Sequence, residues 1–152
     1  MAASDEAVVR RFYEQMNNER KNELAGELFT DDHVMHDPQV QADVGPAGMA
    51  EAISVYQKGV DGHWNIEEIF SVGDKVVTRW TGSGTHVGDV NGIPPSGKKI
   101  RVDAIAIHRM RGGKELAHGI RPGRLARMIV NNVKIGGPEL NGSIIRLDGG
   151  EQ

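Results

Sequence analysis

The stretch GDKVVTRWTGSGTHVGDVNGIPPSGKKIRVDAIAIHRM (Gly73–Met110) decides the fold, because it reads as two long strands joined by a turn. Lys75–Thr81 is rich in the β-branched and aromatic residues that favour strands. Ile100–Met110 has the period of two that places successive side chains on opposite faces of a sheet. Between them, Gly92–Gly97 contains two adjacent prolines, which cannot donate to a strand ladder. We therefore expect the two strands to be antiparallel neighbours.

The alternation in the second strand divides its side chains between two faces. One face carries Val102, Ala104, Ala106 and His108, and the other carries Asp103, Ile105, Ile107 and Arg109. The first face is predicted to point inward. The second mixes apolar with charged side chains, which is typical of a surface used for self-association. We expect a homodimer built on this outer face of the sheet.

The first half of the chain is predicted to be mostly helical. The first helix begins at a Ser4 cap, carries an apolar stripe through Phe12 and Met16, and ends at Asn17-Asn18. The remaining expected elements are a short helix over Glu23–Phe29, a break at Thr30–Asp32, a helix over Pro46–Gln57 and a strand over Trp64–Phe70. Helices followed by strands predict an α+β protein.

Length and composition fit one domain. The chain has 152 residues, a net charge of −3 and no cysteine, so disulfides and thiolate chemistry are excluded. The charge gives no sign of nucleic-acid binding, and no apolar run is long enough to cross a membrane. We expect a cytoplasmic protein with a single domain over residues 1–130 and an atypical C-terminal tail over residues 131–152.

Several motifs resemble one family when they are taken in order. GTHVG (84–88), GIPPSGK (92–98) and the His36-Asp37-Pro38 end of LFTDDHVMHDP resemble the SnoaL-like polyketide cyclases and ester cyclases of the nuclear-transport-factor-2-like superfamily. The resemblance covers about residues 8–118. It implies a cone in which a curved antiparallel sheet wraps over N-terminal helices and encloses one apolar pocket, usually in a homodimer.

The resemblance also implies where catalytic side chains would stand. The acid/base pair of the family cyclases matches Ala106 and Ile120, neither of which exchanges a proton. The polar residues of the related limonene-epoxide hydrolases match Trp80, Gly82 and Ile120. The scaffold of the family is therefore expected without its usual catalytic residues.

Other residues of this chain can supply acid/base chemistry. His118 and His108 carry imidazoles, which gain or lose a proton near neutral pH, and His108 lies beside two small alanines that leave room for a ligand. His36 and Asp37 fit a histidine base oriented by a carboxylate. They fit an Asp-Pro turn with a polar neighbour equally.

Strand alternation predicts one apolar pocket for a small hydrophobic molecule. Its expected lining is Trp80, Ala104, Ala106, His108, Leu116 and His118, closed by Phe12, Met16 and Phe29 from the helices. His33 and His36 are the only histidines at a short spacing, and no third ligand is evident, so we expect neither a metal site nor a cofactor.

The sequence leaves two classes of function open. The first is a cofactor-free cyclase, isomerase or lyase that acts on a hydrophobic carbonyl-bearing substrate with His118, His36 or His108 as base. The second is a non-catalytic small-molecule binding protein, which Ala106 and Ile120 favour.

Overall fold

A computed structural model describes residues 2–36, 43–90 and 92–122. The elements in chain order are α1 (Ala2–Arg11), the π-helix η1 (Phe12–Asn18), the 3₁₀-helix η2 (Asn22–Leu24), α2 (Ala25–Leu28), β1 (Phe29–His36), α3 (Pro46–Gly59), β2 (Val60–Val72), β3 (Lys75–His86), β4 (Lys99–Arg111) and β5 (Lys114–Pro122). In this part of the chain, five strands form one sheet in the order β1-β5-β4-β3-β2. The α+β class is confirmed.

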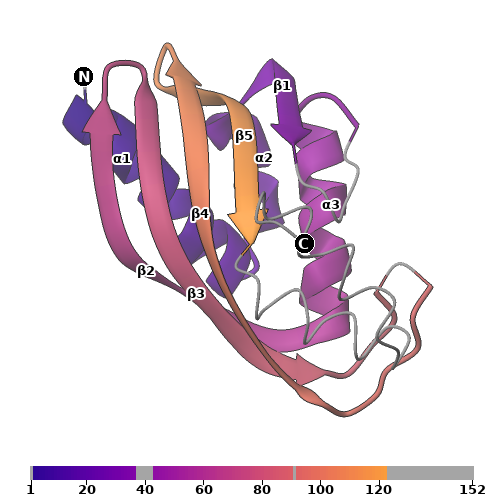
Figure 1. Cartoon of the computed structure of the whole chain (residues 1–152). Helices are drawn as coiled ribbons and strands as arrows, with labels where there is room; N and C mark the ends of the chain where they lie inside the picture. The colour runs from indigo at the N-terminus through magenta and orange to yellow at the C-terminus, as the bar shows by residue number, and fades with distance from the viewer. Residues whose placement is uncertain (1, 37–42, 91, 123–152) are drawn as a thin grey trace, which may run out of the picture.

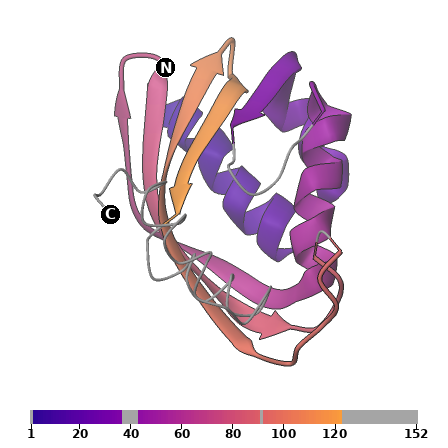
Figure 2. The same cartoon turned by 45° about the vertical axis from the view of Figure 1, so that its right-hand side comes forward.

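The sheet curves around the N-terminal helices, and α3 lies beside the edge strand β1 (Figures 1 and 2). β3 and β4 are antiparallel neighbours, as the sequence predicts, and β2 and β5 flank them in antiparallel pairs. β1 pairs with β5 in parallel, so the sheet is mixed and the expectation of a wholly antiparallel sheet is wrong at this edge. The sheet is open rather than closed into a barrel.

The helices differ from the sequence prediction at their ends. α1 begins at Ala2, so Ser4 lies within the helix and does not cap it. The helical path continues through Phe12–Asn18 in π geometry and ends at Asn18, as expected. The predicted second helix is divided between η2 and α2, and Phe29 already belongs to β1.

The two faces of β4 have the predicted exposures. Its inward residues are buried in alternation, with Ala104, Ala106 and His108 among them. On the outer face, Ile105 is 51% exposed and Ile107 is 48% exposed. The strand therefore separates an interior surface from a half-apolar outer surface.

A β-bulge interrupts the pairing of β4 with β5. Arg109 pairs with Ala117 and Met110 pairs with Glu115, so Leu116 is the extra residue. The bulge restores Glu115 to the inward face on which His118 lies, and Leu116 is only half-buried. Strict alternation, on which the predicted placement of Leu116 beside His118 rests, fails across this bulge, so that placement stays a prediction.

The core lies between the curved sheet and the N-terminal helices. Its buried apolar residues include Phe12, Tyr13 and Met16 from η1, with Trp80 and Ala106 from the strands. Among the described helices, none is long and apolar enough to cross a membrane. The proposed tail over residues 131–152 lies outside the described residues.

Candidate functional site

A buried carboxylate, Glu115, lies at the centre of a cluster of histidines on the inner face of the sheet. Its side chain accepts hydrogen bonds from Nε2 of His33, at 2.7 Å from Oε2, and from Nδ1 of His108 at Oε1. Nδ1 of His118 lies 3.4 Å from Oε2. All four side chains are at most 2% exposed. We call these four residues the histidine–glutamate cluster.

Two hydroxyl groups extend the histidine–glutamate cluster toward the π-helix. Nε2 of His108 lies 3.1 Å from the hydroxyl of Tyr13 and 3.1 Å from Oγ1 of Thr78. The two hydroxyls are themselves 3.0 Å apart. Tyr13 comes from η1 and Thr78 from β3, so the interaction ties the helix to the middle of the sheet.

The hydrogen bonds define which ring nitrogens carry protons. An ionised carboxylate only accepts, so Nδ1 of His108 and Nε2 of His33 donate to Glu115. Nε2 of a neutral His108 then accepts a hydrogen bond from the hydroxyl of Tyr13 or Thr78. Both nitrogens of His108 are occupied by this network.

Burial and charge shift the titration of the central pair. Burial alone would raise the pKa of Glu115, but the imidazoles of His118 and His108 outweigh it and hold that pKa well below 4.5. Burial lowers the pKa of His108 from 6.5, against the opposing charge of Glu115. Burial also raises the pKa of Tyr13. The consistent state near neutral pH is an ionised Glu115 beside a neutral His108.

His118 differs from the other two imidazoles because neither of its ring nitrogens has a hydrogen-bond partner. Its Nδ1 is close enough to Glu115 for an ion pair, but the geometry is not that of a hydrogen bond. The ring packs edge-on against His108 and Phe12, with ring centres 4.4 Å and 5.4 Å away. An unpartnered buried imidazole is unusual and points to a role that packing alone does not explain.

β1 supplies His33 to the histidine–glutamate cluster. The backbone of Gly45, which precedes α3, holds this part of β1 in place. The N–H of Gly45 donates to the carbonyl of His33 at 2.9 Å. Gly45 has φ of 94°, and a Cβ there would lie 2.9 Å from the carbonyl oxygen of Asp31. Only glycine fits this position without strain.

The structure brings together some of the predicted catalytic residues and separates others. His108 and His118 are opposite each other in the β4–β5 register and share the inner face. His36 lies exposed at the end of β1, away from the cluster's interior position. Asp37 lies outside the described residues.

The predicted pocket lining is buried, apart from Leu116. Phe12, Met16, Phe29, Trp80, Ala104 and Ala106 belong to one packed core cluster. Met16, Phe29 and Ala106 are 0% exposed, so no water-sized space adjoins them in this arrangement. Trp80 Nε1 is a buried donor without a partner on the same inner surface. A ligand can reach these groups only if side chains move.

Sequence reasoning missed Glu115, His33, Tyr13 and Thr78. Glu115 and His118 are three residues apart, a spacing that puts them on opposite faces of a regular strand. His33 directly follows Thr30–Asp32, the segment predicted as a break, and the structure places both in β1. Glu115 is the only acidic residue of β5 and lies between His108 and His118 in the sequence. This pattern was the one feature of the sequence that could have indicated the cluster.

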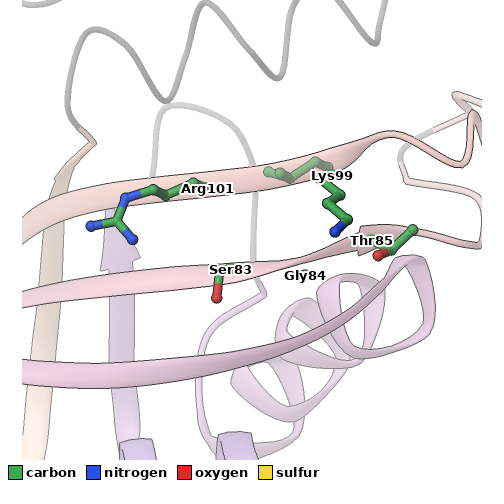
Figure 3. A pocket seen from close by; sticks show the side chains of 6 residues that line it. Ser83, Gly84, Thr85, Lys99 and Arg101 are labelled. Carbon is green, nitrogen blue, oxygen red and sulfur yellow. The ribbon is translucent and has the colours of Figure 1, made fainter.

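A surface pocket of about 430 Å³ lies elsewhere, toward the other end of β3 and β4. Figure 3 shows Lys99 and Arg101 from β4 beside Ser83 and Thr85 from β3. Its cationic lining fits an anionic group. His108 lies near the opposite end of β4, so this pocket is separate from the histidine–glutamate cluster.

Ala106 and Ile120, the positions that match the family acid/base pair, are directly opposite in the β4–β5 register. The structure thus places the two matching positions side by side on neighbouring strands. The methyl group of Ala106 exchanges no proton. Any acid/base chemistry here must come from neighbouring residues.

The chain matches the model of one protein family, the SnoaL-like polyketide cyclases, over residues 7–118. A search of curated proteins finds no significant match. The matched segment ends at His118 and contains the whole histidine–glutamate cluster.

Solved structures with the same fold include three instructive neighbours. TsrD from Streptomyces laurentii is 27% identical over 88% of this chain and 96% of its own, with a TM-score of 0.73. A SnoaL-like polyketide cyclase from Jannaschia sp. CCS1 is 19% identical over 90% of this chain and 95% of its own, with a TM-score of 0.76. An LEH-like epoxide hydrolase from M. tuberculosis is 14% identical over 95% of this chain and 98% of its own, with a TM-score of 0.66.

Proposed function

We propose, for a chain that belongs to the SnoaL-like polyketide cyclase family, that the protein binds a hydrophobic carbonyl-bearing small molecule and that His118 exchanges a proton with it. The observation that carries this proposal is the imidazole of His118, which is buried, has no hydrogen-bond partner and lies beside Glu115. Family membership and the structural neighbours support the coarser statement, a small-molecule enzyme or binder of the cyclase or isomerase type.

His118 has the features of a general base. Its free Nε2 takes a proton from the carbon next to the carbonyl group, which leaves an enolate. The resulting imidazolium is stabilised by the carboxylate of Glu115, 3.4 Å from Nδ1. His118 then returns the proton to the oxygen formed when the enolate carbon attacks a second carbonyl, so an intramolecular ring closure is balanced without a cofactor.

His108 and His33 act as positioning residues in this proposal. Both donate to Glu115 and fix the orientation of its carboxylate toward His118. His108 is itself held by Tyr13 and Thr78, so neither of its nitrogens is free to act as base. The sequence-based role of His108 as a base is therefore replaced by orientation of Glu115.

Ligand entry requires a rearrangement of the interior. The ring of Phe12 covers one side of His118, with ring centres 5.4 Å apart. Two small residues, Ala104 and Ala106, lie on the inner face of β4 between Trp80 and His118. Displacement of the Phe12 ring would open a path over these alanines, with the unpartnered N–H of Trp80 available for a carbonyl oxygen.

The second candidate function is binding without chemistry. It is favoured by Ala106 at one of the positions that match the family acid/base pair. In that case Trp80 and His118 serve only to orient the ligand by hydrogen bonds. The two candidates differ in whether a bound molecule exchanges protons with solvent.

The test begins with a ligand found by native mass spectrometry of the purified protein, or by screening hydrophobic aromatic ketones. Wild type is then compared with His118→Gln and with His63→Gln, an exposed control on β2. We expect incorporation of solvent deuterium next to the carbonyl to fall at least about 100-fold in His118→Gln, with binding retained. His63→Gln should match wild type.

Each other outcome has a defined meaning. Equal deuterium exchange in wild type and His118→Gln would refute the role of His118 as base. A ligand that binds wild type without any exchange would favour the binding protein. Failure of every hydrophobic ketone to bind would contradict both candidates.

A further inference from the structure

We propose that His108, Glu115 and His118 form a binding site for a divalent first-row transition-metal ion such as Zn²⁺ or Co²⁺. This inference goes beyond the proposed function and does not depend on it. The expectation from sequence that the chain has no metal site considered only the spacing of His33 and His36, whereas the structure brings together a different set of three possible ligands.

The potential ligand atoms already converge. One atom from each of His108, Glu115 and His118 lies within 4.8 Å of the other two. Nδ1 of His118 is 3.4 Å from Oε2 of Glu115. Ligands at about 2.0–2.1 Å from a tetrahedral zinc ion are roughly 3.3 Å apart, so this pair already has the required separation.

The donor set selects the class of metal. Two imidazole nitrogens and one carboxylate oxygen suit zinc, iron, cobalt and nickel ions, whereas calcium and magnesium prefer oxygen ligands alone. The three side chains leave at least one coordination position for water or a ligand oxygen. Burial of all three favours direct coordination over a hydrated ion.

The surrounding hydrogen bonds are those that metal sites use to orient their ligands. Nε2 of His108 is bonded to Tyr13 and Thr78, so Nδ1, which is bonded to Glu115 in the metal-free form, is the nitrogen directed at the proposed site. His33 holds the carboxylate of Glu115 through Oε2. Outer partners of this kind fix the tautomer and direction of each ligand.

A second observation is that His118 lacks a bonding partner. His118 is 1% exposed and both of its ring nitrogens lack a hydrogen bond, although the rest of the cluster is bonded. A buried imidazole in this state loses the hydrogen bonds it made to water. A metal ion on Nδ1 would supply the missing partner.

Metal binding would exchange the proton between His108 and Glu115 for the ion. The two groups are hydrogen-bonded through Nδ1 of His108 in the metal-free form. The ion would take the place of that proton on Nδ1, the proton would move to Nε2, where the hydroxyl oxygen of Tyr13 or Thr78 accepts its hydrogen bond, and the two groups would move apart.

The experiment uses the full chain without a histidine tag, treated with EDTA and then titrated with Co²⁺ while its visible absorption is recorded. We expect one ion per chain and the absorption of a coordinated rather than a hydrated ion. His118→Gln should weaken binding at least about 100-fold, the upper end of the loss caused by removing outer partners. His63→Gln, an exposed histidine, should bind as wild type does.

His118→Gln is the decisive variant because His118 makes no hydrogen bond that folding needs, whereas Glu115→Gln can unfold the protein. Circular dichroism confirms that each variant is folded. Absence of Co²⁺ binding, equal binding by His118→Gln, or loss of binding in His63→Gln would overturn the proposal. Ligand binding by the EDTA-treated protein is scored separately, so the proposed function is tested independently.

Discussion

Glu115 organises the interior through its charge. Its two oxygens accept from two imidazoles and face a third, and the group stays ionised although it is buried. A buried carboxylate is tolerated only when hydrogen bonds and opposite charge replace water. The same residue thus holds β1, β4 and β5 together and sets the electrostatic environment of His118.

Replacement of Glu115 by Gln should destabilise the protein. The amide offers one acceptor oxygen in place of two, so either His33 or His108 loses its partner inside the core. We expect the free energy of unfolding to fall by about 2–3 kcal/mol. Urea denaturation of the variant and of exposed His63→Gln, which should change by less than about 0.5 kcal/mol, checks this. A matching value for both variants would contradict the central role of Glu115.

The histidine–glutamate cluster should make stability depend on pH. The pKa of His108 is lowered from 6.5 in the fold, so below that value the unfolded chain binds a proton that the folded chain refuses. The pKa of Glu115 is held well below 4.5, so its contribution is lost as pH falls further. Both effects lower stability on acidification. Denaturant titrations at a series of pH values should show unfolding free energy falling below about pH 6.5.

A control separates His108 from the other histidines. His108→Gln should flatten the part of the pH dependence between neutrality and about pH 5, and His63→Gln should leave it unchanged. Direct titration of the imidazole by NMR gives the same answer without relying on unfolding. An ordinary pKa for His108 in the folded protein would contradict the prediction.

At the scale of elements, the bulge at Leu116 decides which side chains meet. In a regular strand of this sequence, Glu115 and His118 are three residues apart and would point to opposite faces, so the cluster would lose either its carboxylate or one imidazole. The bulge takes up the one extra residue, Leu116, and brings both to the inward face. The bulge is therefore a positioning device and not a defect of the strand.

Deletion of Leu116 should preserve the histidine–glutamate cluster. The deletion leaves Glu115 and His118 two residues apart, so a regular β5 places both on the inward face with the partners Met110 and His108 unchanged. We expect the deletion, like Leu116→Ala, to cost about 1 kcal/mol or less because the side chain is half-buried. Thermal unfolding of both variants is the measurement. A loss of more than about 3 kcal/mol on deletion, as for a broken buried ion pair, would contradict this account of the bulge.

The elements differ in how far the sequence predicts them. The β3–β4 pair and the inward face of β4 follow from period-two patterning, which is a strong local signal. β1 does not, because Thr30–Asp32 reads as polar loop and its strand state comes from pairing with β5, far along the chain. The missed part of the site, His33 and Glu115, lies on this non-local pair and next to the bulge.

At the scale of the whole molecule, the outer face of the sheet supports the proposed homodimer. Phe70, Val77 and Ile107 pair in register across β2, β3 and β4, and so form one apolar row. Phe70 is 49% exposed and Ile107 is 48% exposed, with Ile105 in the next row of the same face. Charged neighbours such as the Arg79–Glu68 ion pair border the row. This composition suits an interface between two copies.

Ile107→Lys should convert a dimer into a monomer, because a charge in the apolar row is costly to bury. Light scattering should give twice the 16.5 kDa chain mass for wild type and the chain mass itself for the variant. Val44→Lys, an exposed apolar position before α3, serves as control and should remain dimeric. A wild-type mass of 16.5 kDa at micromolar concentration would exclude the dimer.

The parallel pairing of β1 with β5 also governs the order in which the parts of the molecule fold. His33 and Glu115 are 82 residues apart, so their contact forms only after a long loop closes. A growing chain on the ribosome has already released its N-terminal helix and β1 long before β5 is synthesised. Until then the apolar side of that helix lacks the last part of its cover, and folding waits for distant contacts. The contact between His33 and Glu115 is thus among the last to form, and a chain shortened before β5 should remain a substrate for chaperones.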